Sequence, residues 1–303
     1  MGQTKRQHYV PRSYLKRFSF DGKLLHTYFI DQDTPTILTD NELRKVWRDV
    51  SISDVCLKKD YHIVRQHSKG NNINPMFLEK DFFQDYAEPK FQSIIDALDG
   101  LAQEFIKKGD IVAPFNITDE QKLTLIQSIF IQYHRSPRLR RPFEEINKII
   151  KHWESSNGKD SLGMDVASTH ADKTYINLFL FRAFAAKLLD YSMLFRVSKN
   201  ENFFTSDNPV VIHKLGTKGN DIFNVNFYTD EFSVFFPLTP YLMVEFYNPE
   251  AFPDSLIMDG TISSVDTEYE NQVNKYQYIN AEKTIFSYKN DFSLFLKTST
   301  NYE

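Results

Sequence analysis

The sequence is poor in cysteine, in glycine and in long apolar runs. Its 303 residues contain one cysteine, Cys56, so no disulfide forms within the chain and no cysteine pair is present to bind zinc. Its ten glycines include no phosphate-binding glycine loop and no dinucleotide fingerprint. The longest apolar run, Ile176–Leu189, contains Arg182 and Lys187 and falls short of the roughly 20 residues of a membrane-spanning helix. We therefore expect a cytoplasmic protein without a membrane segment.

Acidic residues are missing from two stretches of the chain. Residues 1–20 and residues 121–143 each carry five Lys or Arg and no Asp or Glu, although the whole chain has a net charge of −4. The rest of the chain therefore carries −14. This segregation favours a local anion-binding site within an acidic protein.

Aromatic residues are abundant, with 27 Phe and 16 Tyr, and they predict a large aromatic core. The hydrophobic periodicity changes twice along the chain. It predicts a β-rich part over residues 1–70, a mainly helical centre over 76–190 and a β-rich part with a closing helix over 191–303. We expect an α+β fold in which these parts pack into a single domain over residues 1–303.

Several element boundaries follow from local signals. Pro11 favours the first turn of a helix that has Tyr14, Leu15 and Phe18 on one face. Pro89 breaks or kinks the helical stretch that begins at Met76. Residues 118–121 form a capping box, and Pro137 ends the helix that it opens at Ser136. We also expect a helix over 143–156, a loop near 158–163, a helix that ends at Leu189, a closing helix near 264–280 and a strand near 284–288.

The first candidate site is the stretch QHYVPRSYL, residues 7–15. His8 precedes the start of the expected helix and Arg12 lies within its first turn, where free amides favour an anion. A histidine there is suited to general acid–base catalysis near neutral pH. The alternative is a basic arm in which His8 only caps a turn.

The second candidate stretch, QYHRSPRLRR, ends a buried helix. Arg135 at that end either pairs with a structural carboxylate or reaches into a cleft. The remaining arginines of the stretch, Arg138, Arg140 and Arg141, fit a solvated face or contacts to a nucleic-acid backbone.

The third candidate stretch, FFTSDNPVV, places Ser206, Asp207 and Asn208 between two expected strands. The simpler interpretation is a β-turn, because Asp and Asn bond their own backbone and Asn-Pro often begins a turn. The functional interpretation is that Asp207 and Asn208 project into a cleft, where Asp207 orients His8 or binds a metal.

Other polar residues give weaker signals. Glu79 and Glu88 are nine residues apart and would face opposite sides of a straight helix. His62 and His67 have no acidic ligand at a zinc-binding spacing. The alternating apolar residues around Cys56 indicate a buried thiol rather than a nucleophile.

Taken together, QHYVPRSYLKRFS, RSP, FFTSDNPVV and FPLTP resemble the family called domain of unknown function 4238. NKYQYINAEKTIFS near the C-terminus resembles the closing segment of that family, so the resemblance covers nearly the whole chain. It names no reaction. It implies that the matched polar residues His8, Arg135, Asp207 and Asn208 share one cleft.

The resulting hypothesis is a phosphodiester hydrolase, a nuclease acting on RNA or DNA, in a bacterial defence or toxin setting. His8, Arg135 and Asp207 would be catalytic, and substrate would be bound by Arg12, Tyr14, Ser206 and Asn208. The use of a divalent metal such as Mg²⁺ stays open, as does the oligomeric state. One alternative is a protein that binds or senses a nucleotide or another anionic ligand without catalysis. The other is that the motifs only stabilise the fold, with His8 bonded to Asp207.

Overall fold

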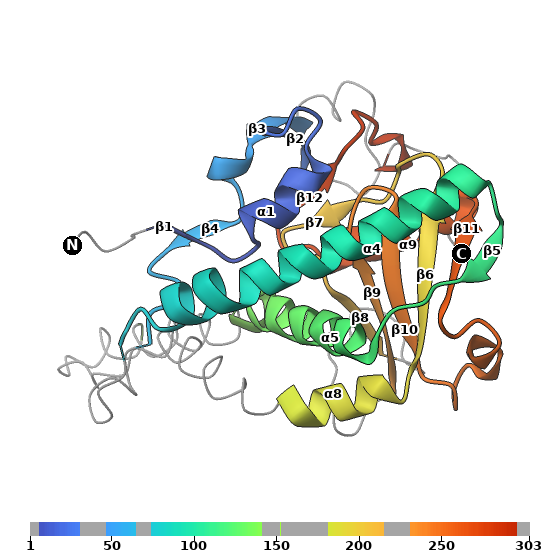
Figure 1. Cartoon of the computed structure of the whole chain (residues 1–303). Helices are drawn as coiled ribbons and strands as arrows, with labels where there is room; N and C mark the ends of the chain where they lie inside the picture. The colour runs from blue at the N-terminus through green and yellow to red at the C-terminus, as the bar shows by residue number, and fades with distance from the viewer. Residues whose placement is uncertain are drawn as a thin grey trace.

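The computed structural model describes residues 6–30, 47–64, 74–140, 152, 181–214 and 231–295, and in these residues helices pack on three β-sheets (Figure 1). This arrangement confirms the α+β class. The largest sheet has the strand order β5 (Val112–Pro114), β11 (Thr261–Val265), β6 (Ser192–Ser198), β10 (Leu242–Tyr247), β9 (Phe232–Pro237) and β8 (Val211–Lys214). The second sheet has the order β3 (Trp47–Ser51), β2 (Leu24–Phe29), β12 (Thr284–Ser287) and β7 (Thr205–Ser206), and the third pairs β1 (Arg6–His8) with β4 (Leu57–Lys59).

The helices of the described residues come mainly from the centre and the end of the chain. The longer ones are η3 (Leu78–Ala87), α4 (Glu88–Lys108), α5 (Asp119–His134), α8 (Phe181–Leu189) and α9 (Thr267–Asn280). The short ones are α1 (Arg12–Leu15), η1 (Lys16–Phe18), η2 (Ile52–Asp54), η6 (Pro253–Leu256) and η7 (Ser293–Phe295).

The six-stranded sheet is covered on both faces. Phe232, Val234 and Phe236 of β9 belong to the large apolar cluster that also contains residues of α4, α5 and α8. Phe235, between them, packs on the opposite face with Val273 of α9. All six residues of β9 are therefore buried, as expected for a strand with helices on both sides. Figure 1 shows α4 and α5 side by side across one face, with α8 at its lower end.

The N-terminal helix is anchored by an aromatic side chain. The Tyr14 hydroxyl lies 2.7 Å from Thr205 Oγ1 and donates to the backbone oxygen of Pro237, also at 2.7 Å. The Tyr14 ring stacks on Phe91 of α4 and on Phe236 of β9. The expected apolar face is confirmed, since Leu15 and Phe18 are buried with Tyr14. Pro11 precedes α1 as its N-cap rather than occupying its first position.

The helical stretch after Met76 changes type where Pro89 was expected to disturb it. η3 is a π-helix, with hydrogen bonds such as Phe82 N to Phe77 O, and it continues into α4, where Pro89 lies in the first turn. A π-helix is rare and is found often at functional sites. Its wider turn also changes the angle between side chains at its two ends, such as those of Glu79 and Glu88.

Most of the other expected boundaries hold within one or two residues. The capping box of Thr118 and Gln121 is formed, and α5 ends at His134 with Arg135 as its C-cap. α9 begins at Thr267 rather than near 264, because residues up to Val265 belong to β11. Apart from His152, which is helical, the helix expected over 143–156 and the loop near 158–163 lie outside the described residues. The single domain stays a prediction, which the spread of the large apolar cluster from Tyr9 to Phe286 supports.

No helix in the described part of the chain combines the length and the apolar character needed to cross a membrane.

Candidate functional site

His8 ends strand β1 and precedes α1, so its side chain lies where a strand becomes a helix. The ring is partly buried, and its Nε2 atom has no hydrogen-bond partner within the described residues. Burial lowers the pKa of His8, and the nearby guanidinium groups of Arg12 and Arg135 lower it further, while a hydrogen bond to the backbone of Ile52 opposes them. At neutral pH the ring is therefore uncharged and able to accept a proton.

Arg135 is the buried cation of the site, with 2% of its surface exposed. Its Nη1 donates to Glu88 Oε1 at 2.9 Å, and its Nη2 donates to the backbone oxygen of His8 at 2.6 Å. Its guanidinium carbon lies 4.3 Å from the centroid of the Phe83 ring. The structural ion pair, which was the first of the two alternatives from the sequence, is confirmed, and that pair lies beside His8.

Glu79 is the second titratable group of the site. Its Oε2 is buried and accepts no hydrogen bond from the described residues, and it lies 4.0 Å from Nε2 of His62. Burial raises the pKa of Glu79 to about 7, the negative charge of Glu88 adds to this rise, and Arg135 opposes it. Glu79 therefore exchanges a proton near neutral pH, which is unusual for a carboxyl group.

The sequence did not indicate this carboxylate pair, because nine residues of regular α-helix would separate Glu79 and Glu88 by half a turn. The π-helical turns of η3 change that angle, and both carboxylates come within electrostatic range of Arg135. Pro89, directly after Glu88, was the available signal that the helix is irregular here.

A small cavity lies beside Arg135, between the residue before α1 and the facing sides of α4 and α5. Its volume is about 10 Å³, which is enough for one water molecule. Pro11, Glu88 and Gln132 are among the residues that line it.

Of the other predicted binding residues at the N-terminus, Arg12 is exposed and Tyr14 is not. Arg12 forms no ion pair within the described residues, and its charge acts on His8. Tyr14 is 1% exposed, and its hydroxyl is engaged by Thr205 and Pro237. Arg12 is thus available to an anion from solvent, and Tyr14 is part of the core.

Asp207 lies in a different, fully buried network. Its Oδ1 accepts from the backbone N–H of Glu282 at 2.8 Å and its Oδ2 from that of Lys283 at 2.9 Å. Burial raises the pKa of Asp207 to about 7, although those two N–H groups oppose the shift. Across the described residues no hydrogen bond joins Asp207 to His8.

The neighbours of Asp207 fasten helix α9 to the segment around β7. The Ser206 hydroxyl donates to Gln277 Oε1 at 2.9 Å, and Asn208 Nδ2 donates to the backbone oxygen of Asn280 at 2.9 Å. Asn280 Nδ2 in turn donates to the backbone oxygen of Asn208 at 2.7 Å. The structure therefore brings His8, Arg12 and Arg135 together and places Ser206, Asp207 and Asn208 in a separate packing network.

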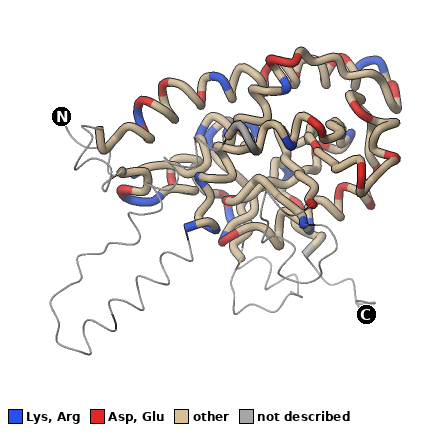
Figure 2. Tube along the Cα trace, turned by 90° about the horizontal axis from the view of Figure 1, so that it is seen from below, with Lys and Arg blue, Asp and Glu red and all other residues tan. Residues whose placement is uncertain are grey.

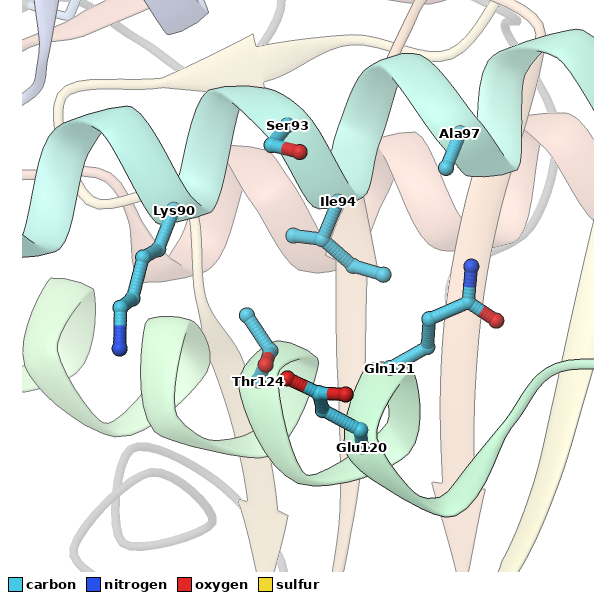
Figure 3. Close-up of a pocket in the computed structure, with 7 residues that line it drawn as sticks. All are labelled: Lys90, Ser93, Ile94, Ala97, Glu120, Gln121 and Thr124. Carbon is cyan, nitrogen blue, oxygen red and sulfur yellow. The ribbon is translucent and has the colours of Figure 1, made fainter.

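A larger groove lies between α4 and α5, with a volume of about 230 Å³ (Figure 3). Figure 3 shows Lys90, Ser93 and Ile94 of α4 facing Gln121 and Thr124 of α5 across it. The Gln121 side chain is already engaged, because its oxygen accepts from the backbone N–H of Thr118 in the capping box. None of the titratable groups around Arg135 lines this groove.

Within the described residues no group of three or more His, Cys, Asp or Glu side chains has the arrangement of a metal site. The buried Cys56 has a thiol pKa well above its ordinary value because of burial, which agrees with the expected inert thiol.

Comparison with known proteins places the chain in a family and supplies no characterised relative. No curated protein and no solved structure matches the chain significantly. The family model described as "Protein of unknown function (DUF4238)" matches residues 6–291. This range includes every residue of the site described above, and the chain therefore belongs to the DUF4238 family.

Proposed function

We propose that the chain is a phosphodiester hydrolase whose acid–base groups are His8 and Glu79. One observation carries the proposal: an uncharged imidazole and a carboxyl group with a pKa of about 7 share Arg135 and Glu88 as charged neighbours. The two environments shift the pKa values in opposite directions, so that the carboxyl can hold a proton near neutral pH while the imidazole does not, and such a pair is typical of acid–base catalysis.

In the proposed reaction, water attacks the phosphorus atom and His8 Nε2 accepts the proton that the water loses. The new bond is phosphorus to water oxygen, and the broken bond is phosphorus to the leaving ester oxygen. The protonated carboxyl of Glu79 donates its proton to that oxygen, so the products are a phosphomonoester and an alcohol. Exchange with solvent then restores neutral His8 and protonated Glu79.

Arg12 is the proposed contact for the phosphate, because it is exposed, unpaired within the described residues and close enough to His8 to lower its pKa. Arg135 acts differently in this proposal. It is buried and donates to the His8 backbone and to Glu88, so it positions His8 and adds positive charge near the phosphate.

The packing of α9 is the role left to Ser206, Asp207 and Asn208. Both oxygens of the Asp207 carboxylate already accept backbone N–H groups, which leaves little capacity to orient His8 or to bind Mg²⁺. The proposed reaction therefore assigns no metal ligand to Asp207.

The charge distribution favours a substrate held at one point. Figure 2 shows Lys and Arg positions mixed with Asp and Glu positions along most of the described trace, so the basic positions are local, as in the two stretches without acidic residues. A single-stranded RNA or DNA end, or a small diester, fits such a local cation better than a long duplex does. Nucleic acid and nucleotides remain the proposed partners.

The test is hydrolysis by wild type, His8→Asn, Glu79→Gln and the control His26→Asn, whose histidine pairs with Asp49 outside the site. Substrates are tRNA, single-stranded RNA, plasmid DNA and bis-p-nitrophenyl phosphate, each with and without Mg²⁺ or Mn²⁺. We expect cleavage by wild type and His26→Asn and a loss of at least 100-fold in the two site variants.

Circular dichroism must show that all four proteins are folded. If folded wild type cleaves none of these substrates, the hydrolase proposal fails and the alternative of anionic-ligand binding takes its place. If His8→Asn and Glu79→Gln retain full activity, the reaction belongs to another site.

A further inference from the structure

A further cavity lies between α9 and the six-stranded sheet, beside strand β8. Its lining residues come from the part of the chain between His213 and Tyr276 and do not include Arg135. Its volume is about 270 Å³. Its walls are mainly aromatic, and they are formed by Phe235, Tyr247, Phe252, Tyr269 and Tyr276. A concave site with aromatic walls and a few polar groups is typical of small-molecule binding.

One polar group in this cavity is buried and unsatisfied. Ser233 of β9 is 1% exposed and lines the cavity, and its hydroxyl has no hydrogen-bond partner in the described part of the chain. Buried hydroxyl groups almost always have a partner, because losing water without replacing its hydrogen bonds is costly. The Ser233 hydroxyl is therefore ready to bond a molecule in the cavity.

The cavity carries no net charge. Of its described lining residues only His213 ionises near neutral pH, and burial lowers the pKa of His213, so its ring is uncharged there. Glu245 lies behind Tyr269, whose hydroxyl donates to it, but Arg196 Nε already pairs with Glu245 at 2.9 Å. Neither a cationic nor an anionic ligand would find an unpaired counter-charge here.

The walls offer both ring faces and ring edges. His213 and Tyr276 are stacked at 5.5 Å between centroids, and Phe235 meets Tyr247 edge-on at 5.8 Å. The Tyr276 hydroxyl accepts a hydrogen bond at 3.0 Å from Nε2 of Gln272, which also lines the cavity. Aromatic walls of this kind suit a flat ring. The cavity volume is slightly below the range of about 300–1,000 Å³ that is typical for drug-sized ligands, so the ligand should be smaller than these.

We propose that this cavity binds one small, uncharged, planar heterocycle of the size of a free nucleobase, with a hydrogen bond to the Ser233 hydroxyl. This cavity is independent of the proposed hydrolase site. None of its lining residues is His8, Glu79, Glu88 or Arg135.

The first test is a titration of the whole chain followed by calorimetry and saturation-transfer NMR. The probes are adenine, hypoxanthine, cytosine and uracil, with choline as a cationic probe and benzoate as an anionic ring. We expect at least one base to bind and to raise the melting temperature, and neither choline nor benzoate to do so. Failure of all four bases to bind the folded protein overturns the proposal, as does preferential binding of choline or benzoate.

The second test locates the bound base. Ser233→Ala should weaken its binding about fivefold, the loss of one hydrogen bond, while the free protein stays at least as stable because an unsatisfied hydroxyl is removed. Tyr276→Ala, which removes a half-buried wall, should weaken binding at least tenfold. The control is Ser264→Ala on β11, where another buried hydroxyl lacks a partner in the described residues but lies outside the cavity.

Ser264→Ala should leave base binding unchanged. If Ser233→Ala and Tyr276→Ala bind the base as tightly as wild type does, the base occupies another place and the proposal is wrong. Loss of binding in these variants with hydrolysis unchanged separates this site from the proposed hydrolase.

Discussion

The guanidinium of Arg135 donates to the backbone oxygen of His8 at 2.6 Å, and this bond joins the end of α5 to the end of β1 across 127 residues of sequence. The same guanidinium pairs with Glu88 at the start of α4. Three separate elements therefore depend on one buried cation. Two of the predictions below concern Arg135 and Glu79, and two concern the packing residues Asp207 and Tyr14.

Arg135→Met should destabilise the protein by about 3 kcal/mol, because breaking a buried pair leaves Glu88 and the His8 carbonyl without their donor. Urea unfolding measures the change. The control is Arg6→Met, which removes an exposed pair with Asp54 at 3.5 Å and should cost less than about 1 kcal/mol. Equal losses in the two variants would contradict the role of burial.

The stability of Glu79→Gln relative to wild type should increase as the pH rises. The pKa of Glu79 is raised to about 7 in the folded state from an ordinary value of 4.5, so ionising this carboxyl costs more free energy in the folded state than in the unfolded state. Wild type therefore loses stability between about pH 4.5 and pH 7 through this group, and the loss is complete above pH 7. Gln at this position removes the penalty.

The free energy of unfolding of Glu79→Gln minus that of wild type should therefore increase with pH. We expect this difference to be about 2–3 kcal/mol larger at pH 8 than at pH 4.5. Chemical unfolding at four pH values between these limits measures it. A difference that does not change with pH would show that Glu79 titrates normally.

Asp207→Ala should destabilise the protein by about 3 kcal/mol, because two buried backbone N–H groups, those of Glu282 and Lys283, lose their acceptor. Asp207→Asn keeps one acceptor oxygen and should cost less. Both variants, once folded, should hydrolyse a diester at the wild-type rate. A rate loss of 100-fold in folded Asp207→Asn would instead restore Asp207 to a catalytic role.

Tyr14→Phe should cost about 1–2 kcal/mol, because the hydroxyl bonds to Thr205 and Pro237 are lost while the stacked ring remains. The affinity for substrate should not change, since Tyr14 is buried. Thermal unfolding and the KM for a diester measure the two effects. A raised KM with unchanged stability would assign Tyr14 to substrate binding.

Much of the fold was predictable because its signals are local. The capping box at Thr118 and the strands on either side of Asp207 depend on neighbouring residues alone. Pro89 indicated an irregular helix, but not that the irregularity is a π-helix.

The site was predictable only in part, because tertiary contacts decide it. The stretch around His8 and the arginine that ends α5 were found from sequence, and the structure brings them together. Glu79 was missed, since its pKa depends on burial against residues far along the chain. Asp207 has the sequence signature of a site residue, but only the structure reveals that two backbone groups already occupy its carboxylate.

The position of Tyr14 has a consequence for how the protein is made. Its ring is enclosed by Phe91 and Phe236, and its hydroxyl contacts Thr205 and Pro237, so its burial requires a segment more than 220 residues downstream. When only the first half of the chain has left the ribosome, the aromatic side chains near the N-terminus still lack these partners and are exposed. Such distant contacts slow folding, and we expect this segment to dock last, after synthesis has passed Pro237.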